Sequence, residues 1–211
     1  MSSNITTTLE PGTFYHIFNR GNDGINIFYK GKNYRYFLTK YDQYMSGYVD
    51  TYCFCLLPNH FHLLAKVKPS DDVARKAAVD FPKNFSEEGY TDARAVSERF
   101  RRFFMSYAKS INQQEGRSGS LFQKYFRRQA VTDDAYFTRL IWHIHNNAVH
   151  HGLHDNLETY SWSSYQRILT DKPSKLMKEE VLAWFGGRDN YVAFHRDNTA
   201  DTSAVELLLL E

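Results

Sequence analysis

The sequence Leu56-Leu57-Pro58-Asn59-His60-Phe61-His62-Leu63-Leu64 contains two histidines separated by one large apolar residue. Side chains alternate across a β-strand with a period of two, so His60 and His62 point to the same side. Apolar runs flank the stretch at 52–57 and 63–67, and Pro58-Asn59 between them is a turn signal. The stretch therefore predicts a β-hairpin whose second strand carries both imidazoles near its start.

Two imidazoles on one face of an apolar strand favour a metal site, because neutral imidazole is the commonest side-chain ligand of metal ions. The alternative is that His60 and His62 are surface histidines on a half-exposed sheet. Two ligands do not complete a site. A third ligand and a reactive group must therefore come from elsewhere in the chain.

Composition narrows the class of protein. The chain has 211 residues and a formal net charge of +2, so it is large enough for a real core and any nucleic-acid surface would be a local patch. Its two cysteines, Cys53 and Cys55, share one strand face, which favours reduced thiols over a disulfide framework. No apolar run is long enough to cross a membrane and the start of the chain is polar, so we expect a cytoplasmic protein without membrane contact.

The spacing of apolar residues predicts the remaining elements. We expect a strand over 13–20, a helix over 33–44, the hairpin, a helix over 92–114 and a strand over 121–131. Residues 69–95 are predicted to be a variable connection with a short helix over 72–79. This order is βαββαβ, the ferredoxin-like arrangement, and the predicted fold class is therefore α+β.

A further helix is predicted to begin at Thr132 or Asp133 and to run through Ala148. One stripe of this helix is apolar and suited to packing on the sheet. The neighbouring stripe carries Tyr136, Leu140, His143 and Asn147, and we expect it to face the two histidines. Short helices are expected over 174–185 and 191–195, so we divide the chain into a domain over 1–170 and a C-terminal helical extension and tail over 171–211.

Five short motifs in this order resemble the HUH, one-tyrosine transposases, in particular the REP-associated tyrosine transposases and their insertion-sequence relatives. Each motif is weak by itself, and together they cover roughly residues 13–165. The carriers are Tyr15-His16-Ile17-Phe18-Asn19-Arg20-Gly21, Leu57-Pro58-Asn59-His60-Phe61-His62-Leu63-Leu64, Gly119-Ser120-Leu121-Phe122-Gln123, Ile144-His145-Asn146-Asn147-Ala148-Val149-His150-His151-Gly152 and Trp162-Ser163-Ser164-Tyr165.

The resemblance implies a nuclease domain that binds single-stranded DNA, usually beside a hairpin, and cuts it for transposition and recombination. In the family the two histidines hold Mg²⁺ or Mn²⁺, which polarises the scissile phosphate. A tyrosine on the helix after the fourth strand attacks phosphorus and forms a 5′-phosphotyrosine. Asn147 matches the position of a third metal ligand. The family includes monomers and homodimers.

The sequence departs from the family at the expected nucleophile, where His143 stands in place of tyrosine. Three explanations compete. In the first, the protein is a domesticated or decayed member that binds DNA hairpins without strand transfer. In the second, Tyr136, two helical turns earlier, is the nucleophile. In the third, His143 acts as nucleophile or as fourth metal ligand, or the metal activates water for hydrolysis. A structural zinc domain unrelated to nucleic acid is a further alternative, for which His60, His62 and Asn147 are a poor ligand set.

Cations alternate with aromatic residues in two segments, a pattern suited to phosphates and unstacked bases. In the predicted fourth strand the cations are Lys124, Arg127 and Arg128, and Arg20 follows the first strand. A second run, Arg99, Arg101 and Arg102, lies on the helix over 92–114. The alternative is that these charges are solvated and the aromatic residues are core.

Overall fold

A four-stranded antiparallel sheet organises the computed structural model, which describes residues 7–83, 90–132 and 134–197. Its strands are β1 (Phe14–Arg20), β2 (Val49–Leu57), β3 (His60–Val67) and β4 (Arg127–Val131), in the spatial order β2-β3-β1-β4. This order and the intervening helices are those of the predicted ferredoxin-like fold.

Strand β3 of the hairpin directs apolar side chains to one face of the sheet and the two histidines to the other face. Phe61, Leu63, Ala65 and Val67 alternate along β3 and are buried in one core. The intervening residues, His60 and His62 among them, point to the opposite face of the sheet, as the alternation along the strand requires. The predicted hairpin and its turn are confirmed.

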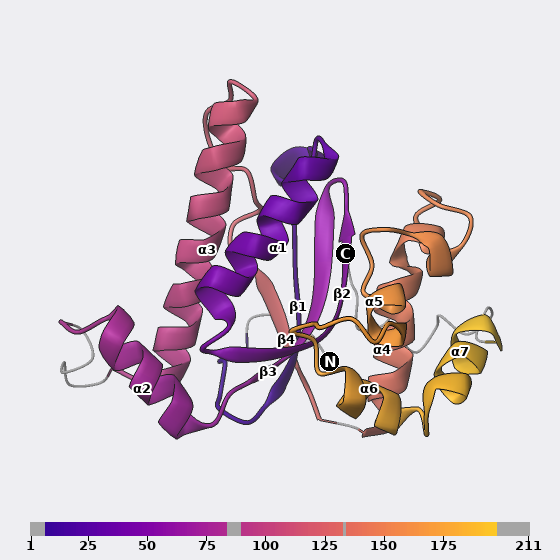
Figure 1. Ribbon diagram of the computed structural model, residues 1–211. Coiled ribbons are helices and arrows are strands. Elements are labelled where there is room, and N and C mark those ends of the chain that lie inside the picture. The colour runs from indigo at the N-terminus through magenta and orange to yellow at the C-terminus, as the bar shows by residue number, and fades with distance from the viewer. Residues whose placement is uncertain (1–6, 84–89, 133, 198–211) are drawn as a thin grey trace.

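Helices α1 (Gly31–Met45) and α3 (Asp92–Gln114) cover the first face, with α2 (Ser70–Asp80) at their end (Figure 1). Phe37 is at the centre of this layer, because its ring lies 4.9–5.2 Å from those of Phe28, Phe61, Phe103 and Tyr107. The bounds of α3 coincide with the prediction. No helix in the described ranges has the length and apolarity needed to cross a bilayer.

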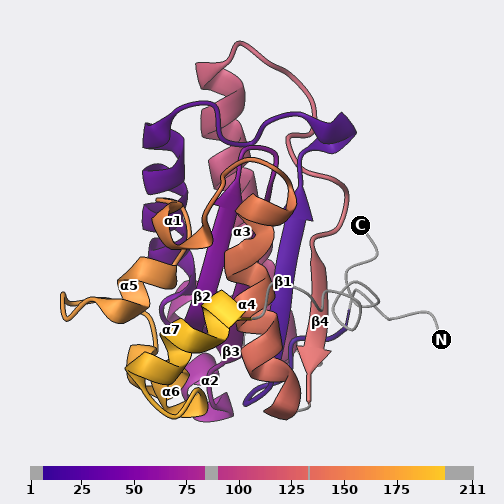
Figure 2. The same ribbon diagram turned by 90° about the vertical axis from the view of Figure 1, so that its right-hand side faces the viewer.

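The second face is covered by α4 (Asp134–His150), which lies against the sheet in Figure 2. Helices α5 (Tyr165–Leu169), α6 (Lys178–Trp184) and α7 (Arg188–Asp197) pack outside and beside it, and two short 3-10 turns span Asn22–Gly24 and Leu157–Thr159. Val181 of α6, Tyr191 of α7 and Phe185 between the two helices are buried in the same core as the apolar stripe of α4. The predicted extension is thus packed on the second layer.

A buried chain of hydrogen bonds ties α7 to the sheet. The Phe54 N–H donates to Ser164 Oγ (2.9 Å), which lies 2.7 Å from His145 Nε2. His145 Nδ1 lies 2.9 Å from His195 Nε2, and His195 Nδ1 lies 2.8 Å from the carbonyl oxygen of Tyr191. Burial lowers the pKa of both histidines, so both are neutral at pH 7. Because the Tyr191 carbonyl oxygen only accepts, His195 Nδ1 donates to it, and every hydrogen bond from the Phe54 N–H to Tyr191 then runs in the same direction.

The outer edge of β2 is occupied by passing backbone. Leu56 N–H donates to the carbonyl oxygen of Trp162, Ser164 N–H to that of Phe54, and Met177 N–H to that of Thr51, at 2.9–3.0 Å. These bonds satisfy backbone groups that an edge strand would otherwise expose.

Several predicted boundaries were wrong, among them those of the helix predicted over 191–195, which spans Arg188–Asp197. The fourth strand begins at Arg127 rather than at residue 121, because Tyr125 has a left-handed backbone (φ 64°) that ends an extended run. The helix predicted over 174–185 covers only Lys178–Trp184. Asp133 and the tail over 198–211 lie outside the described residues. Both cysteines are free and buried, as predicted.

Candidate active site

His60 and His62 lie at the start of β3, under α4. Both are buried, with exposed fractions of 5% and 1%, and their ring centroids are 5.3 Å apart. His60 Nδ1 lies 2.7 Å from the side-chain oxygen of Asn59, an acceptor, so the His60 proton is on Nδ1 and its lone pair on Nε2. The turn residue before the strand thus sets the tautomer of the first predicted ligand.

His16 is a member of this site that the sequence analysis did not assign a role. Its Nε2 lies 3.0 Å from His62 Nδ1, and the two rings stack with centroids 5.2 Å apart. β1 pairs with β3 so that Phe18 is opposite His62, which places His16 on the same face, diagonally across from it. The strand alternation puts His16 on this face, but only the pairing register brings it to His62.

Helix α4 supplies His143 and Asn147, as predicted. His143 is buried, its ring centroid lies 6.5 Å from that of His62, and its Nε2 has no hydrogen-bond partner within the described ranges. Asn147 Nδ2 donates to the carbonyl oxygen of His143 (2.9 Å), which fixes the carboxamide. A hydrogen bond with Asn147 also raises the pKa of His60, against the larger effect of burial.

Two exposed histidines at the end of α4 complete a group that we name the histidine cluster. His151 lies 4.8 Å from His60 and His150 lies 6.3 Å from His143, between ring centroids. Neither residue was among the predicted site residues. The histidine cluster consists of His16, His60, His62, His143, His150 and His151.

The buried members of the histidine cluster are neutral at pH 7. Burial, with a smaller contribution from a neighbouring histidine in each case, lowers the pKa of His16, His60 and His143 to about 3. Burial lowers the pKa of His62 in the same way, and His16 adds to the effect. Neutral imidazoles have a lone pair available for a metal ion without first losing a proton.

The donor set fits a divalent ion that is completed by substrate. No three His, Cys, Asp or Glu side chains of the described chain converge as metal ligands, so a third protein ligand must be of another type. The Asn147 carboxamide meets this need, since it lies beside His60 and offers an oxygen. Two imidazoles and one amide oxygen leave positions for phosphate and water.

A small pocket of about 50 Å³ opens beside the two histidines. Two of the predicted DNA contacts, Arg20 and Arg127, line it together with His60 and His62, and Gln123 joins them. Arg127 reaches this face because it is opposite Phe18 in the sheet, and its guanidinium lies over the Phe18 ring. Positive charge is therefore placed beside the predicted metal position.

The other two predicted DNA contacts are elsewhere. Arg128 points to the opposite face, where its Nε donates to the carbonyl oxygen of Thr7 (2.6 Å) and its guanidinium lies over the Phe126 ring. Burial lowers the pKa of Arg128. Lys124 lies over the exposed ring of Tyr125 at 5.2 Å.

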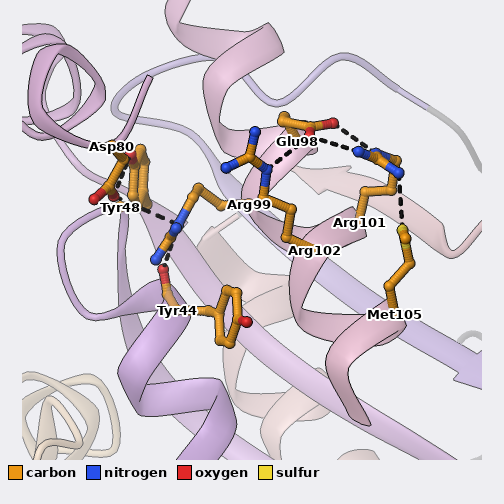
Figure 3. Close-up of polar contacts among 8 residues, drawn as sticks. All are labelled: Tyr44, Tyr48, Asp80, Glu98, Arg99, Arg101, Arg102 and Met105. Atoms are coloured by element: carbon orange, nitrogen blue, oxygen red, sulfur yellow. Dashed lines mark hydrogen bonds and ion pairs between the residues drawn. The ribbon is translucent and has the colours of Figure 1, made fainter. Parts of the chain in front are cut away.

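Arg99 ties α3 to α1 and α2, whereas Arg101 and Arg102 pair with Glu98 within α3 (Figure 3). Arg99 donates to the carbonyl oxygen of Tyr44 (3.1 Å) and pairs with Asp80 (3.5 Å). Glu98 binds both Arg101 and Arg102, at 2.6 and 2.9 Å. These contacts are with neighbouring protein groups, in agreement with the structural alternative for this segment.

No protein-family model matches the chain. A curated protein of Haemophilus influenzae, named for a REP-associated tyrosine transposase, is 25% identical over 154 residues, which are 72% of this chain and 77% of that protein. The solved structure of a REP-associated tyrosine transposase bound to a REP hairpin has the same fold, with a TM-score of 0.56 and 17% identity over 82% of this chain and 89% of that one. The chain is thus similar in sequence to one REP-associated tyrosine transposase and shares the fold of another. The resemblance drawn from the five motifs is thereby confirmed.

The position that matches the expected nucleophile of the REP-associated tyrosine transposases carries His143, whose ring faces that of His62. Tyr136 lies two turns earlier on α4 and packs on the second core. The rings of its neighbour Phe137 and of Phe14 have centroids 4.6 Å apart. Phe14 is at the start of β1, whereas Phe18, which is opposite His62 of β3, lies toward the other end of that strand. Burial raises the pKa of Tyr136 to about 12, which disfavours its phenolate.

Proposed function

We propose that this chain is a DNA-processing protein of the HUH type, which binds single-stranded DNA beside a hairpin and cleaves it with His143 in place of the tyrosine. The relative whose structure is solved was bound to a REP hairpin, and this chain shares its fold. The observation that carries the proposal is the buried His143 Nε2, which faces His62 and has no hydrogen-bond partner in the described part of the chain.

In this proposal His60, His62 and Asn147 hold Mg²⁺ or Mn²⁺, which when bound would polarise the scissile phosphate. Arg20 and Arg127, at the rim of the adjacent pocket, orient the DNA backbone. The lone pair on His143 Nε2 attacks phosphorus, so that a P–N bond forms and the P–O3′ bond breaks. The 3′ oxygen leaves with a proton from water, and the 5′ phosphate stays on His143.

A second candidate function is hairpin binding without cleavage. It is favoured by one observation on Tyr136, the alternative nucleophile on α4. This tyrosine is partly buried against the second core, and burial raises its pKa. In this case the histidine cluster would be a DNA-binding surface whose metal positions the phosphate.

The test uses single-stranded oligonucleotides that contain a hairpin, with Mn²⁺, analysed by denaturing gel and intact-protein mass. We expect wild type to cut and to carry a 5′-linked adduct that His143→Ala abolishes and Tyr136→Phe leaves intact. Cutting without an adduct would indicate attack by water. Binding without cutting, with cutting gained in His143→Tyr, would establish the second candidate. An adduct lost only in Tyr136→Phe would place the nucleophile at Tyr136.

A further inference from the structure

A second hollow, of about 570 Å³, lies between α3 and the segment over 119–128. We name it the α3 groove, and its volume is within the range of small-ligand pockets. Its apolar surface comes from both sides, and the residues that matter here are Phe104, Met105, Lys109, Phe122, Tyr125 and Phe126.

Two large apolar side chains of the α3 groove face solvent. The exposed fractions are 70% for Tyr125 and 56% for Met105, whereas Phe104 and Phe122 beneath them are buried. Tyr125 holds this position through its left-handed backbone (φ 64°), which non-glycine residues rarely adopt. An exposed aromatic ring over an apolar floor is suited to stacking of a planar ring.

The charge of the α3 groove is of one sign. Lys109 lines it and Lys124 lies over the Tyr125 ring, whereas the other two lining cations already have protein partners, Glu98 for Arg101 and the Thr7 carbonyl for Arg128. None of its lining residues within the described ranges is acidic. Such a surface is complementary to a phosphodiester chain.

The α3 groove is continuous with the candidate active site. Asn19 and Gln123 line both the α3 groove and the small pocket beside His60 and His62. The backbone between them is fixed, because Gln123 N–H donates to the carbonyl oxygen of Arg20 (2.8 Å) and Asn22 N–H to that of Leu121 (3.0 Å). A strand of DNA leaving the histidine cluster past Gln123 would enter the α3 groove.

We propose that the α3 groove binds an unpaired nucleotide next to the DNA hairpin, with its base stacked on Tyr125. This inference rests on the proposed function, since it takes the DNA strand at the histidine cluster as given. It assigns recognition of the unpaired flank to residues outside the metal site.

The test measures the affinity of two hairpins, one with and one without an unpaired flank, with 2-aminopurine placed in turn at each flank position. Tyr125→Asn removes the ring while tolerating the left-handed backbone, Tyr125→Trp keeps a ring, and Val79→Ala changes an equally exposed apolar residue on α2. We expect Tyr125→Asn to bind the flanked hairpin about tenfold more weakly and to lose the quenching of one 2-aminopurine. The bare hairpin should bind all four proteins equally.

Equal affinity of wild type and Tyr125→Asn for the flanked hairpin would overturn this inference and leave the proposed function standing. A loss that is the same for both hairpins would also overturn it, because the effect would not involve the flank. Failure of wild type to bind either hairpin would overturn the proposed function and this inference together. Thermal melting of each variant checks that folding is unchanged.

Discussion

His16 Nε2 lies 3.0 Å from His62 Nδ1, and this contact joins β1 to β3 on the face that α4 covers. When His62 binds a metal through Nε2, its proton must be on Nδ1, and His16 is then the acceptor that holds this tautomer. The partner of a metal ligand is thus supplied by a strand that carries none of the predicted ligands.

We therefore expect His16→Phe, which keeps a planar ring but removes the acceptor, to weaken Mn²⁺ binding about tenfold. Isothermal titration with Mn²⁺ measures this affinity directly. His195→Phe, which alters a buried histidine outside the histidine cluster, is the control. Unchanged affinity in His16→Phe would show that His62 is not a ligand or does not need this partner.

Asn147 is predicted to supply the third protein ligand, an amide oxygen. Asn147→Leu should abolish Mn²⁺ binding at micromolar metal, whereas Asn147→Asp should bind Mn²⁺ at least about tenfold more tightly, because a carboxylate replaces a neutral oxygen beside His60. The same titration distinguishes the two variants from wild type. Equal Mn²⁺ affinity in all three proteins would remove Asn147 from the site.

Arg127 and Arg128 are neighbours in sequence with different expected roles. Arg127→Gln should weaken hairpin binding and reduce the slope of log affinity against log salt by about 0.7, the value for one phosphate contact in a single strand. Arg128→Gln should instead lower the free energy of unfolding by about 1 kcal/mol, since its bond to Thr7 is lost. Salt titrations and urea unfolding of both variants provide the check, and an interchange of the two effects would contradict it.

The buried His195 predicts loss of stability in acid. Burial lowers the pKa of His195 to about 4 from an ordinary value of 6.5, so the unfolded chain binds a proton that the folded chain does not. Stability therefore falls as the pH decreases from 6.5 to 4, by roughly 3 kcal/mol from this residue.

Urea unfolding at pH 7.5 and pH 5 measures this effect. His195→Leu should lose less stability than wild type over this range, because its contribution to proton uptake is gone. The other buried histidines have lowered pKa values too, so acid should still destabilise the variant in part. A pH dependence identical to that of wild type would rule out His195 as a contributor.

Much of the fold could be predicted from local pattern. The bounds of α3 follow from helical spacing that ends at a glycine-rich segment, and the hairpin follows from alternation around Pro58-Asn59. The start of β4 could not be predicted, because a left-handed tyrosine leaves no compositional signal. Length and residue type made 121–131 look like one strand.

The candidate site was predictable where one element carries the residues. His60 and His62 share a strand face, and His143 and Asn147 share a helix stripe. His16 was missed because its contact depends on the register between β1 and β3, which alternation alone does not give. Arg127 and Arg128 were grouped, although adjacent residues of a strand point to opposite faces; that signal was present in the sequence.

The covered edge of β2 bears on how copies of this chain can assemble. Two sheets often join by placing edge strands side by side, so that one continuous sheet runs through a dimer. Here the backbone at Trp162, Ser164 and Met177 already occupies those hydrogen-bonding positions. A homodimer of this protein would therefore not form by strand pairing along β2, so its interface would have to use β4, the other edge strand of the sheet, or helix and loop surfaces.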